Sequence, residues 1–495
     1  MKTVNLLAID LGAESGRVIL GHFKRKTLQL EDVHRFTNGP VRLPDGLHWD
    51  VLRLWTEIQS GLKSAAQRAT LGGAGLDTWG VDFALLDAQD VLLEYPYHYR
   101  DSRTDGMMDE AFRRVPRPEI FASTGIQFLQ FNSLYQLLAM AIKASSKLEI
   151  ARTFLTIPDL FNFWMTGRKV CEFTNATTTQ CYNPLTGDWA RPMLQRLGLP
   201  VQIFPRIVPP GTLLGDLLPA VAGSLGIQPI PIIAPACHDT GSAVAAVPAD
   251  ESDFAWISSG TWSIVGVDVP RAVITPRALE YNLTNEGGVG GSFRLSRNVM
   301  GLWLVQECRR TWASQGEELS YDDLTRLADA APSLRSIIDP DRPEFLKPGD
   351  MPARIRSECE RTGQPIPEDK GAILRCTLES IALKYRWVLE KLEVLRRAPI
   401  KTIHIVGGGT RNRLLSQLTA DACGRKVITG PMEATAIGNL IVQAVALGKA
   451  ASLAEARAVV RASFDNETFS PRRQQSDRAG DAWDSAFERL KNVAS

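Results

Sequence analysis

Two short hairpins of similar design, about half a chain apart, constrain the fold more than any other feature of the sequence. Residues 4–21 contain two apolar runs joined by a polar, Gly-bearing turn at 10–16. Residues 254–267 contain two further runs joined by the small polar turn 258–261. Apolar runs that flank a short Gly-containing turn are typical of β-hairpins. Their repetition predicts an internal duplication of one architecture.

Strand and helix patterns alternate through the rest of the chain. Strands or strand ends are predicted at 75–83, 231–234 and 403–406, helices at 50–70, 242–247 and 435–447, and a Pro-rich loop at 205–211. This alternation is typical of an α/β protein. The polar segment 249–253 divides the chain, so we expect one domain over residues 1–248 and another over 249–495.

Composition narrows the possible functions. The 495 residues suffice for two large domains, and 44% of them are hydrophobic, as in a protein with a full core. The 56 Lys and Arg residues nearly balance the 55 Asp and Glu residues, so we expect neither a nucleic-acid nor a lipid-surface partner. No run approaches the roughly 18 apolar residues that cross a membrane, and no secretory signal is evident, so we expect a cytoplasmic protein.

The hairpin turns contain residues that suit phosphate binding. Gly12, Ser15 and Gly16 in the first turn, and 258–261 in the second, let the backbone approach closely and offer its N–H groups. Two such turns facing each other would hold a triphosphate between two domains. Asp10, just ahead of the first turn, could orient Mg²⁺ through water. The alternative is that each is merely a tight turn. The P-loop motif is absent.

Two further features suit a nucleotide-dependent transfer. Gly407–Gly409 follow a strand, and a backbone without side chains can lie along an adenine or a ribose; the alternative is a flexible loop. Asp239 begins a helix of small residues, where the helix dipole favours the ionised carboxylate and allows it to act as a base. The alternative is an N-capping aspartate, and position alone does not separate the two. His238 is expected to support Asp239.

Together these residues resemble the FGGY family of carbohydrate kinases over nearly the whole chain. The resemblance rests on the runs 10–17, 77–82, 99–104, 124–127, 238–240, 258–262, 282–288 and 298–303. It implies an α/β fold of two actin-like (ribonuclease H-like) domains with an active-site cleft between them.

The resemblance also implies site residues and cofactors. ATP would be bound by Ala13, Glu14, Ser15, Gly16, Arg17, Thr261, Gln306 and Gly408. The sugar would be bound by Gly80, His238, Asp239, Thr240 and Asn298. Asp239 would be the catalytic base, and the cofactors would be ATP and Mg²⁺, with Asp10 as the water-mediated metal residue.

Within the family, the motifs are most similar to those of kinases that phosphorylate L-rhamnulose at its 1-hydroxyl. A kinase for another ketose or polyol, such as L-fuculose or D-xylulose, is the alternative within this class. An actin-like ATPase that binds a protein is the alternative from another class. Asp239, placed to meet a small acceptor, argues against that ATPase.

The chain departs from the family pattern at a few positions. Glu14 stands where many relatives carry Ser, so its side chain must avoid the phosphates. Ala236 and Cys237 precede His238 where Ser is frequent, and Thr419 replaces a Cys, so no bond to Cys423 can form. Cys359 and Cys376 match a pair that is bonded in the family, whereas a reducing compartment favours free thiols. None of the seven cysteines forms a Cys-x-x-Cys motif, which argues against a zinc site.

Overall fold

The structure is a computed structural model that describes residues 3–250, 253–472 and 478–493. Its contacts divide the chain into two compact units. The first comprises Met1–Asp250, Asp268–Leu295 and Glu433–Phe464, and the second Glu251–Val267, Ser296–Met432 and Asp465–Ser495. Two segments from beyond residue 248 are therefore grouped with the first unit. The division into domains at residue 248 stays a prediction.

The strands and helices are distributed over the whole described chain. The strands are β1 (Val4–Leu11), β2 (Ser15–Lys24), β3 (Thr27–Thr37), β4 (Pro40–Leu43), β5 (Gly46–Trp49), β6 (Leu71–Thr78), β7 (Phe83–Leu86), β8 (Thr153–Thr156), β9 (Cys171–Glu172), β10 (Tyr182–Asn183), β11 (Asp188–Trp189), β12 (Ile207–Val208), β13 (Thr212–Asp216), β14 (Pro231–Ala234), β15 (Phe254–Ser259), β16 (Trp262–Val269), β17 (Thr284–Gly287), β18 (Phe293–Met300), β19 (Thr402–Val406), β20 (Lys426–Thr429) and β21 (Glu467–Phe469). The α-helices are α1 (Val51–Arg68), α2 (Met107–Arg114), α3 (Arg117–Thr124), α4 (Ser133–Ile142), α5 (Ser146–Ile150), α6 (Ile157–Thr166), α7 (Phe173–Thr178), α8 (Arg191–Arg196), α9 (Pro219–Leu225), α10 (Asp239–Ala245), α11 (Pro276–Glu280), α12 (Trp303–Ser314), α13 (Tyr321–Ala330), α14 (Met351–Arg361), α15 (Lys370–Arg396), α16 (Arg413–Cys423), α17 (Ala434–Ala446), α18 (Leu453–Ser463) and α19 (Arg478–Val493).

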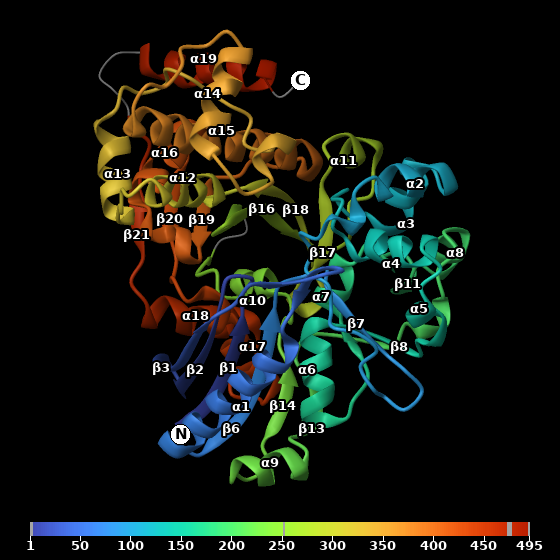
Figure 1. Ribbon diagram of the computed structural model, residues 1–495. Coiled ribbons are helices and arrows are strands. Elements are labelled where there is room, and N and C mark those ends of the chain that lie inside the picture. The colour runs from blue at the N-terminus through green and yellow to red at the C-terminus, as the bar shows by residue number, and fades with distance from the viewer. Residues whose placement is uncertain (1–2, 251–252, 473–477, 494–495) are drawn as a thin grey trace. The chain divides into compact units, whose positions relative to one another are not determined.

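The first unit is built on a six-stranded sheet with the order β13-β14-β6-β1-β2-β3. Strands β1 and β2 form the first predicted hairpin, and β1, β6 and β14 run parallel to one another. Asp10 on β1 lies opposite Asp77 on β6, and Thr78 is bridged to His238 just beyond β14. The parallel strands thus bring three polar strand ends to one edge of the sheet (Figure 1).

A seven-stranded sheet has the order β17-β18-β16-β15-β19-β20-β21. Its strands β15, β19, β20 and β21 lie in the second unit. Five strands of this sheet form a regular succession. The antiparallel hairpin of β16 and β15 is followed by β19 and β20, which run parallel to β15, and then by the antiparallel edge strand β21. The first sheet has the same succession in β2, β1, β6, β14 and β13. The two sheets therefore share the duplicated architecture that the hairpins predict.

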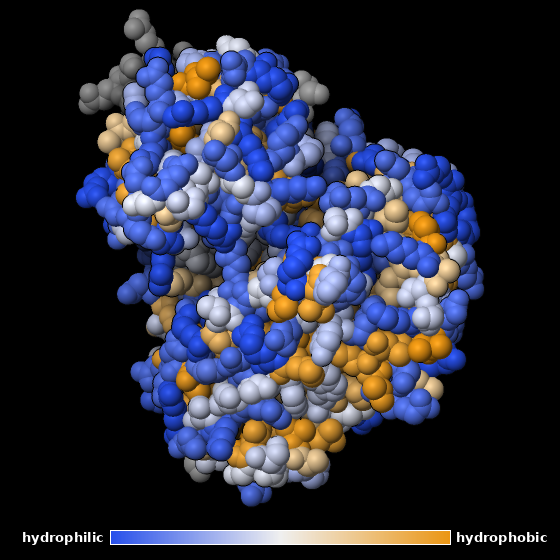
Figure 2. All heavy atoms as spheres, in the orientation of Figure 1, coloured by the Kyte–Doolittle hydropathy of each residue, from blue (hydrophilic) through white to orange (hydrophobic). Residues whose placement is uncertain are grey.

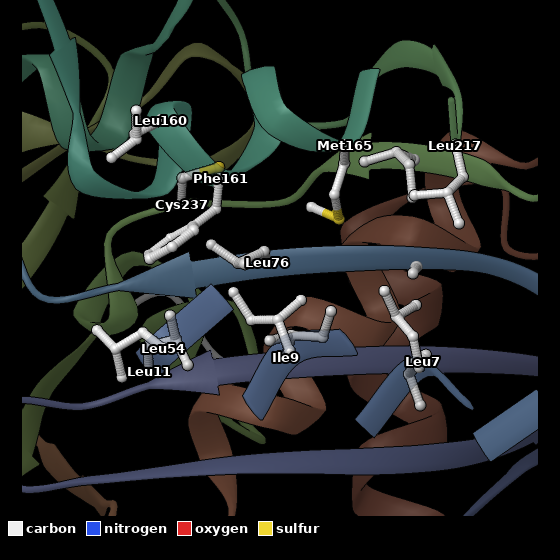
Figure 3. Packing of buried hydrophobic residues seen from close by; sticks show 14 of the residues in the cluster. Leu7, Ile9, Leu11, Leu54, Leu76, Leu160, Phe161, Met165, Leu217 and Cys237 are labelled. Atoms are coloured by element: carbon white, nitrogen blue, oxygen red, sulfur yellow. The ribbon is translucent and has the colours of Figure 1, made fainter. Parts of the chain in front are cut away.

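The first sheet is buried on both faces, which explains why residues 6–11 of β1 are all buried. Leu7, Ile9 and Leu11 join a cluster with residues of α1 and α6, and Figure 3 shows these side chains meeting Leu54 and Leu76. Helix α17 contacts β1, β2 and β6 from the other face (Figure 1). Covering helices on both faces are typical of parallel sheets.

Helix α17 holds the start of α10 in place through close backbone packing. At Gly438 an added Cβ would overlap the carbonyl oxygen of Ser242, so only glycine allows the two helices to approach this closely. On the same helix, Asn439 donates hydrogen bonds to Gly75 O at 3.1 Å and Asp77 Oδ2 at 2.6 Å. Gln443 donates to Leu7 O at 2.9 Å. These contacts fix α10 and the sheet to one helix.

Two buried carboxyl groups organise the segment beside β14. Glu172 caps α7 by accepting from Thr174 N at 3.0 Å, and it also accepts from Cys237 N at 3.0 Å. Asp159 accepts from Glu172 N at 3.1 Å and from the hydroxyl of Thr156. Burial raises the pKa of Asp159 to about 8 and that of Glu172 to about 7. The pair thereby ties α6, α7 and the end of β14 together.

The structure corrects several predicted boundaries. The first hairpin turn is shorter than predicted, because Asp10 and Leu11 extend β1 while Ser15 and Gly16 begin β2. Helix α10 begins at Asp239 rather than at 242. The Pro-rich segment predicted as a loop contains β12, which pairs with β9 because Ile207 and Val208 have free backbone groups between the prolines.

All seven cysteines are free thiols, including Cys359 and Cys376, which are both buried. A hydrogen bond with Cys376 lowers the pKa of Cys359, so the two thiols are close to each other.

Figure 2 shows hydrophilic residues over much of the visible face, with apolar residues gathered in places. No helix in the described parts of the chain is both long and apolar enough to span a membrane.

Replacing Gly438 by alanine should destabilise the protein by about 1–3 kcal/mol, because the new methyl group must displace the Ser242 backbone. Gly223, also inside a helix, is the matched control: it is exposed and has no atom within 4 Å of an added Cβ. Gly223→Ala should stabilise the protein by up to about 1 kcal/mol, because alanine favours a helix more than glycine does. Thermal unfolding of both variants tests this, and equal effects would contradict the packing argument.

Stability should fall as the pH rises from 6 to 9, because the folded state holds protons on Asp159 and Glu172 that the unfolded chain releases. Their folded pKa values, about 8 and about 7, lie above the ordinary values of 3.8 and 4.5. The stabilisation is complete below those ordinary values and is lost as pH rises through the folded ones, by at most about 1.4 kcal/mol per pH unit for each proton. The free energy of unfolding of Asp159→Asn should fall less steeply with pH than that of the parent, as measured by unfolding experiments across this pH range. Parallel curves for parent and variant would contradict this assignment.

Candidate active site

The first hairpin turn presents a short stretch of backbone beside β1. Gly12 N donates to Ser15 O at 2.9 Å and closes the turn, while Asn38 donates from its side chain to Gly12 O at 2.8 Å. Ala13 is partly buried, and Glu14 and Ser15 are exposed. Gly16 is required for another reason, since an added Cβ would overlap the ring of Phe36. The turn is therefore held in place by Asn38 and by its packing on Phe36, while its tip at Glu14 and Ser15 is exposed to solvent.

Asp10 and Arg17 form a buried ion pair across this hairpin. Arg17 donates to Asp10 Oδ2 from Nε at 2.7 Å and pairs with it through Nη2 at 2.6 Å. Its Nη1 lies 2.8 Å from Glu433, which is also paired with Arg35 at 2.8 Å. The charge of Asp10 raises the pKa of Arg17. Arg17 thus links the hairpin to the residue that precedes α17.

Asp77 lies beside Asp10, and burial raises the pKa of both carboxyl groups. Burial raises the pKa of Asp77 well above its ordinary value, and the charges of Asp10 and Asp239 raise it further. Its Oδ2 accepts from Asn439, and no described residue forms a hydrogen bond with its Oδ1. The charge of Arg17 and its hydrogen bond lower the pKa of Asp10 against burial, so Asp10 and Asp239 are better suited than Asp77 to carry a negative charge at this edge of the sheet.

Asp239 combines a fixed position with an accessible carboxylate. It is the first residue of α10, and the capping position belongs to His238, which forms no capping hydrogen bond with its side chain. Asp239 Oδ1 accepts from the backbone N–H of Thr240 and from its hydroxyl at 3.1 Å. The side chain is 30% exposed. The described residues donate no hydrogen bond to Oδ2, so that oxygen can accept from a bound molecule.

The turn at Gly80 is strained and tightly held. Val81 has φ +68°, which is unfavourable for a β-branched residue. Its N–H donates to the Thr178 hydroxyl at 3.0 Å, and its carbonyl accepts from Ser133. An added Cβ at Gly80 would lie 3.0 Å from Thr178. Strain of this kind persists where surrounding groups hold the backbone, and it concentrates at functional sites.

Asp82, two residues beyond Gly80, anchors this turn from inside the protein. It accepts from the indoles of Trp49 at 2.6 Å and Trp79 at 3.0 Å, and from Gln136 at 2.9 Å. Burial raises the pKa of Asp82 to about 6. Because its oxygens are occupied by protein donors, Asp82 is better suited to hold the turn than to accept a substrate proton.

In the second unit, the second hairpin turn is joined to a helix. Gly260 N donates to Trp262 O at 2.9 Å, and Trp303 N at the start of α12 donates to Thr261 O at 3.1 Å. Thr261 is partly buried. Gln306 lies one turn further along α12, and no described residue forms a hydrogen bond with its buried Oε1. The predicted residues Thr261 and Gln306 are thus brought to one hairpin and the helix bonded to it.

The three glycines after β19 have different roles. Gly407 has φ +90°, and an added Cβ there would lie 3.0 Å from Ser259 O. An added Cβ at Gly409 would overlap the Ser259 side chain. These two glycines allow the loop to pack on the end of β15, whereas at Gly408 a Cβ would meet nothing within 4 Å. Gly408 therefore presents open backbone, as an adenosine contact requires.

The structure places the predicted residues in two groups. Asp10, residues 13–17, Gly80 and residues 238–240 belong to the first unit, while Thr261, Asn298, Gln306 and Gly408 belong to the second. Asn298 is partly buried on β18.

Sequence reasoning missed three residues of the first group: Asp77, Glu433 and Asn439. Asp77 could have been found, because two parallel strands that each end in Asp place those residues side by side. Glu433 and Asn439 are more than 350 residues away from their partners, and no local pattern connects them.

The residues at this edge fit a magnesium ion held mainly through water. The described chain contains no cluster of three or more His, Cys, Asp or Glu side chains that could enclose a metal ion. Mg²⁺ keeps several waters and binds to one or two carboxylates together with substrate phosphates. Asp10 and Asp239 supply two carboxylates, of which Asp10 is already paired with Arg17. Contact through water suits that pairing.

Solved structures of known proteins share this fold. A ligand-bound xylulose kinase from Lactobacillus acidophilus aligns with a TM-score of 0.81 at 17% identity, covering 99% of this chain and 97% of its own. A Plasmodium falciparum glycerol kinase with ADP aligns with a TM-score of 0.77 at 16% identity, covering 99% and 98%. These likenesses confirm the predicted two-domain α/β fold.

Sequence relatives are closer. A rhamnulokinase of Bacteroides thetaiotaomicron is 45% identical over 489 residues, which are 99% of each chain. A rhamnulokinase of Oceanobacillus iheyensis is 43% identical over 464 residues, which are 94% of this chain and 97% of the relative. The N-terminal domain model of the FGGY family of carbohydrate kinases matches residues 5–246, and its C-terminal domain model matches 255–447. With matches along nearly its whole length, the chain belongs to the FGGY family of carbohydrate kinases.

Proposed function

We propose that this protein phosphorylates L-rhamnulose at its 1-hydroxyl, using ATP and producing L-rhamnulose 1-phosphate and ADP. The observation that carries the proposal is Asp239, a partly exposed carboxylate with one oxygen anchored by Thr240 and the other available. The choice of sugar is supported by the 45% identity with a rhamnulokinase over 99% of both chains.

Asp239 acts as the base on the sugar hydroxyl. Its Oδ2 accepts the hydrogen bond of the attacking hydroxyl and takes its proton as the hydroxyl oxygen bonds to the γ-phosphorus of ATP. The bond from that phosphorus to the bridging oxygen breaks, and ADP leaves with the bonding electrons. In phosphoryl transfer much of the catalysis is positioning, so orientation of the hydroxyl is part of this role. Gly80, His238, Thr240 and Asn298 are proposed to bind the sugar. Asp82 is the alternative base, and its occupied oxygens argue against it.

The nucleotide is proposed to bind through backbone groups of the two hairpin turns. Ala13 to Gly16 offer the first turn, Arg17 supports it from β2, and Thr261, Gln306 and Gly408 offer the second unit's contacts. Glu14 is exposed, which is compatible with a side chain that avoids the phosphates. Mg²⁺, when bound, neutralises phosphate charge, and Asp10 would orient it through water. The interdomain cleft and the cytoplasmic location stay predictions.

ADP formation should require both Mg²⁺ and a ketose, and L-rhamnulose should give the highest kcat/KM in a panel that includes L-fuculose and D-xylulose. The reason is that Asp239 needs an acceptor hydroxyl to complete the transfer. A coupled ADP assay on the purified protein measures this. ADP released at the same rate without any sugar would favour the ATPase alternative, and a preference for another ketose would correct the substrate.

Asp239→Asn should reduce kcat by more than about 100-fold while the protein stays folded, because the amide cannot take the hydroxyl proton. Removal of a general base typically costs about 10²–10⁴-fold in rate. Sugar affinity, measured by calorimetry, should change far less than turnover, since the amide oxygen can still accept a hydrogen bond.

Asp82→Asn is the comparison variant, because Asp82 is the alternative base. It should lose stability because Asp82 accepts from four protein donors, the two indoles, Gln136 and the Tyr99 backbone, while kcat per folded molecule stays within about tenfold of the parent. Turnover within a few-fold of the parent in Asp239→Asn, together with a collapse in Asp82→Asn, would transfer the role of base to Asp82.

A further inference from the structure

A buried chain of polar side chains leads from the interior of the first unit to Asp239. Arg294 and Glu286 are almost fully buried, with 0% and 5% of their surface exposed, and His238 is 7% exposed. Arg294 Nη2 lies 3.0 Å from His238 Nδ1 and 3.1 Å from Glu286 Oε2. His238 Nε2 lies 3.4 Å from Asp239 Oδ1. The imidazole therefore stands between a buried guanidinium and the proposed base.

The chemistry of arginine decides the direction of these contacts. A guanidinium has five N–H donors and no acceptor, so the hydrogen bond between Arg294 and Nδ1 requires Nδ1 to accept. The hydrogen of a neutral imidazole must then be on Nε2, which faces Asp239. Nδ1 also lies 3.3 Å from Glu286 Oε2, but that oxygen forms no hydrogen bond with any described residue. A doubly protonated ring would place an Nδ1–H against an Arg294 N–H at 3.0 Å, with two donors opposed. The geometry thus selects the neutral ring with its hydrogen on Nε2.

We propose that Arg294 is a positioning residue that fixes the tautomer of His238 and, through it, the orientation of the Asp239 carboxylate. This inference rests on the proposed role of Asp239 as base. His238 directs its Nε2–H toward Oδ1, the oxygen that already accepts two hydrogen bonds from Thr240. The two hydrogen bonds from Thr240, together with an imidazole N–H facing the same oxygen at 3.4 Å, oppose rotation of the carboxylate. The other oxygen, Oδ2, is left as the proton acceptor.

Glu286 compensates the buried positive charge of Arg294, which otherwise could not remain beside His238. A buried charge is costly unless it is paired, and Glu286 supplies the counter-charge to the guanidinium. Arg294 Nε also donates to Gly287 O at 2.8 Å, which fixes the plane of its side chain. Burial raises the pKa of Glu286, but the neighbouring His238 and the charge of Arg294 lower it by more, so the pKa lies below its ordinary value. Glu286 therefore remains the anionic partner that the arrangement needs.

The tautomer can be measured directly on the whole protein labelled with ¹⁵N-histidine. The chain has six histidines, so the signals of His238 can be assigned by their loss in His238→Gln. In the parent, we expect a protonated Nε2 and an unprotonated Nδ1. This measurement requires neither substrate nor a stable variant of Arg294. A parent in which Nδ1 carries the hydrogen would overturn the proposal.

Variants then connect the tautomer to the reaction. In Arg294→Met the Nδ1–H form should become populated, and kcat should fall by about tenfold or more while the sugar KM changes by less than about threefold. Arg294→Lys retains a charged donor at this position. It should therefore keep much of the parental His238 tautomer and much of the parental kcat. Arg425→Met is the matched control, because Arg425 also pairs with a partly buried carboxylate, Glu393, at 2.9 Å. It should lose stability and leave the His238 tautomer and kcat unchanged.

The outcomes separate this proposal from the proposed function. If the parent forms ADP with no ketose, the function fails, whatever the tautomer is. If the parent is an active kinase but Arg294→Met keeps both the parental tautomer and the parental kcat, the positioning role fails and the function stands. A loss of activity in Arg425→Met equal to that in Arg294→Met would assign the effect to stability alone and would also overturn the proposal.

Discussion

Three aspartates meet at the carboxyl ends of adjoining parallel strands, and the need to accommodate their charges shapes the first unit. Like charges in a buried place cannot all be ionised without compensation. Asp10 is paired with Arg17, Asp77 has a raised pKa and accepts a hydrogen bond from Asn439, and Asp239 remains partly exposed to solvent. The three aspartates therefore differ in ion pairing, pKa and exposure, although they are the same residue type. Asp239, the exposed aspartate, is the one that suits the proposed role of base.

The backbone that carries Asp239 is fixed from two sides. Glu172 and Thr174, at the start of α7, accept hydrogen bonds from the backbone of Cys237 and His238, at 3.0 Å each. On the other side, Gly438 allows α17 to touch the backbone of α10. The proposed base thus lies at the junction of a strand end and two helices. Such rigid support keeps a carboxylate within the narrow geometry that phosphoryl transfer requires.

Local patterns predicted the elements better than their exact ends. The hairpins, the strand over 231–234 and the helix over 435–447 follow from apolar runs and periodicity, which depend only on neighbouring residues. The small residues predict a helix over 242–247 with Asp239 at its N-terminus as base or cap, whereas in the structure Asp239 is the first helical residue and His238 holds the capping position. Asp10 and Asp239 could be selected from sequence, because Asp10 stands just ahead of the first hairpin turn and Asp239 stands at the start of a helix of small residues.

The sequence by itself determined the α/β class, the duplicated hairpins and the residues of the proposed chemistry, because these depend on residue type and short spacing. Only the tertiary structure decided which aspartate is paired with a cation, which is buried with a raised pKa, and which is accessible. Arg294 lies 56 residues from His238, and Asn439 lies 362 residues from Asp77. Contacts over such separations are set by the folding of distant segments onto one sheet. Burial and partners, rather than residue type, therefore give each carboxyl group its role.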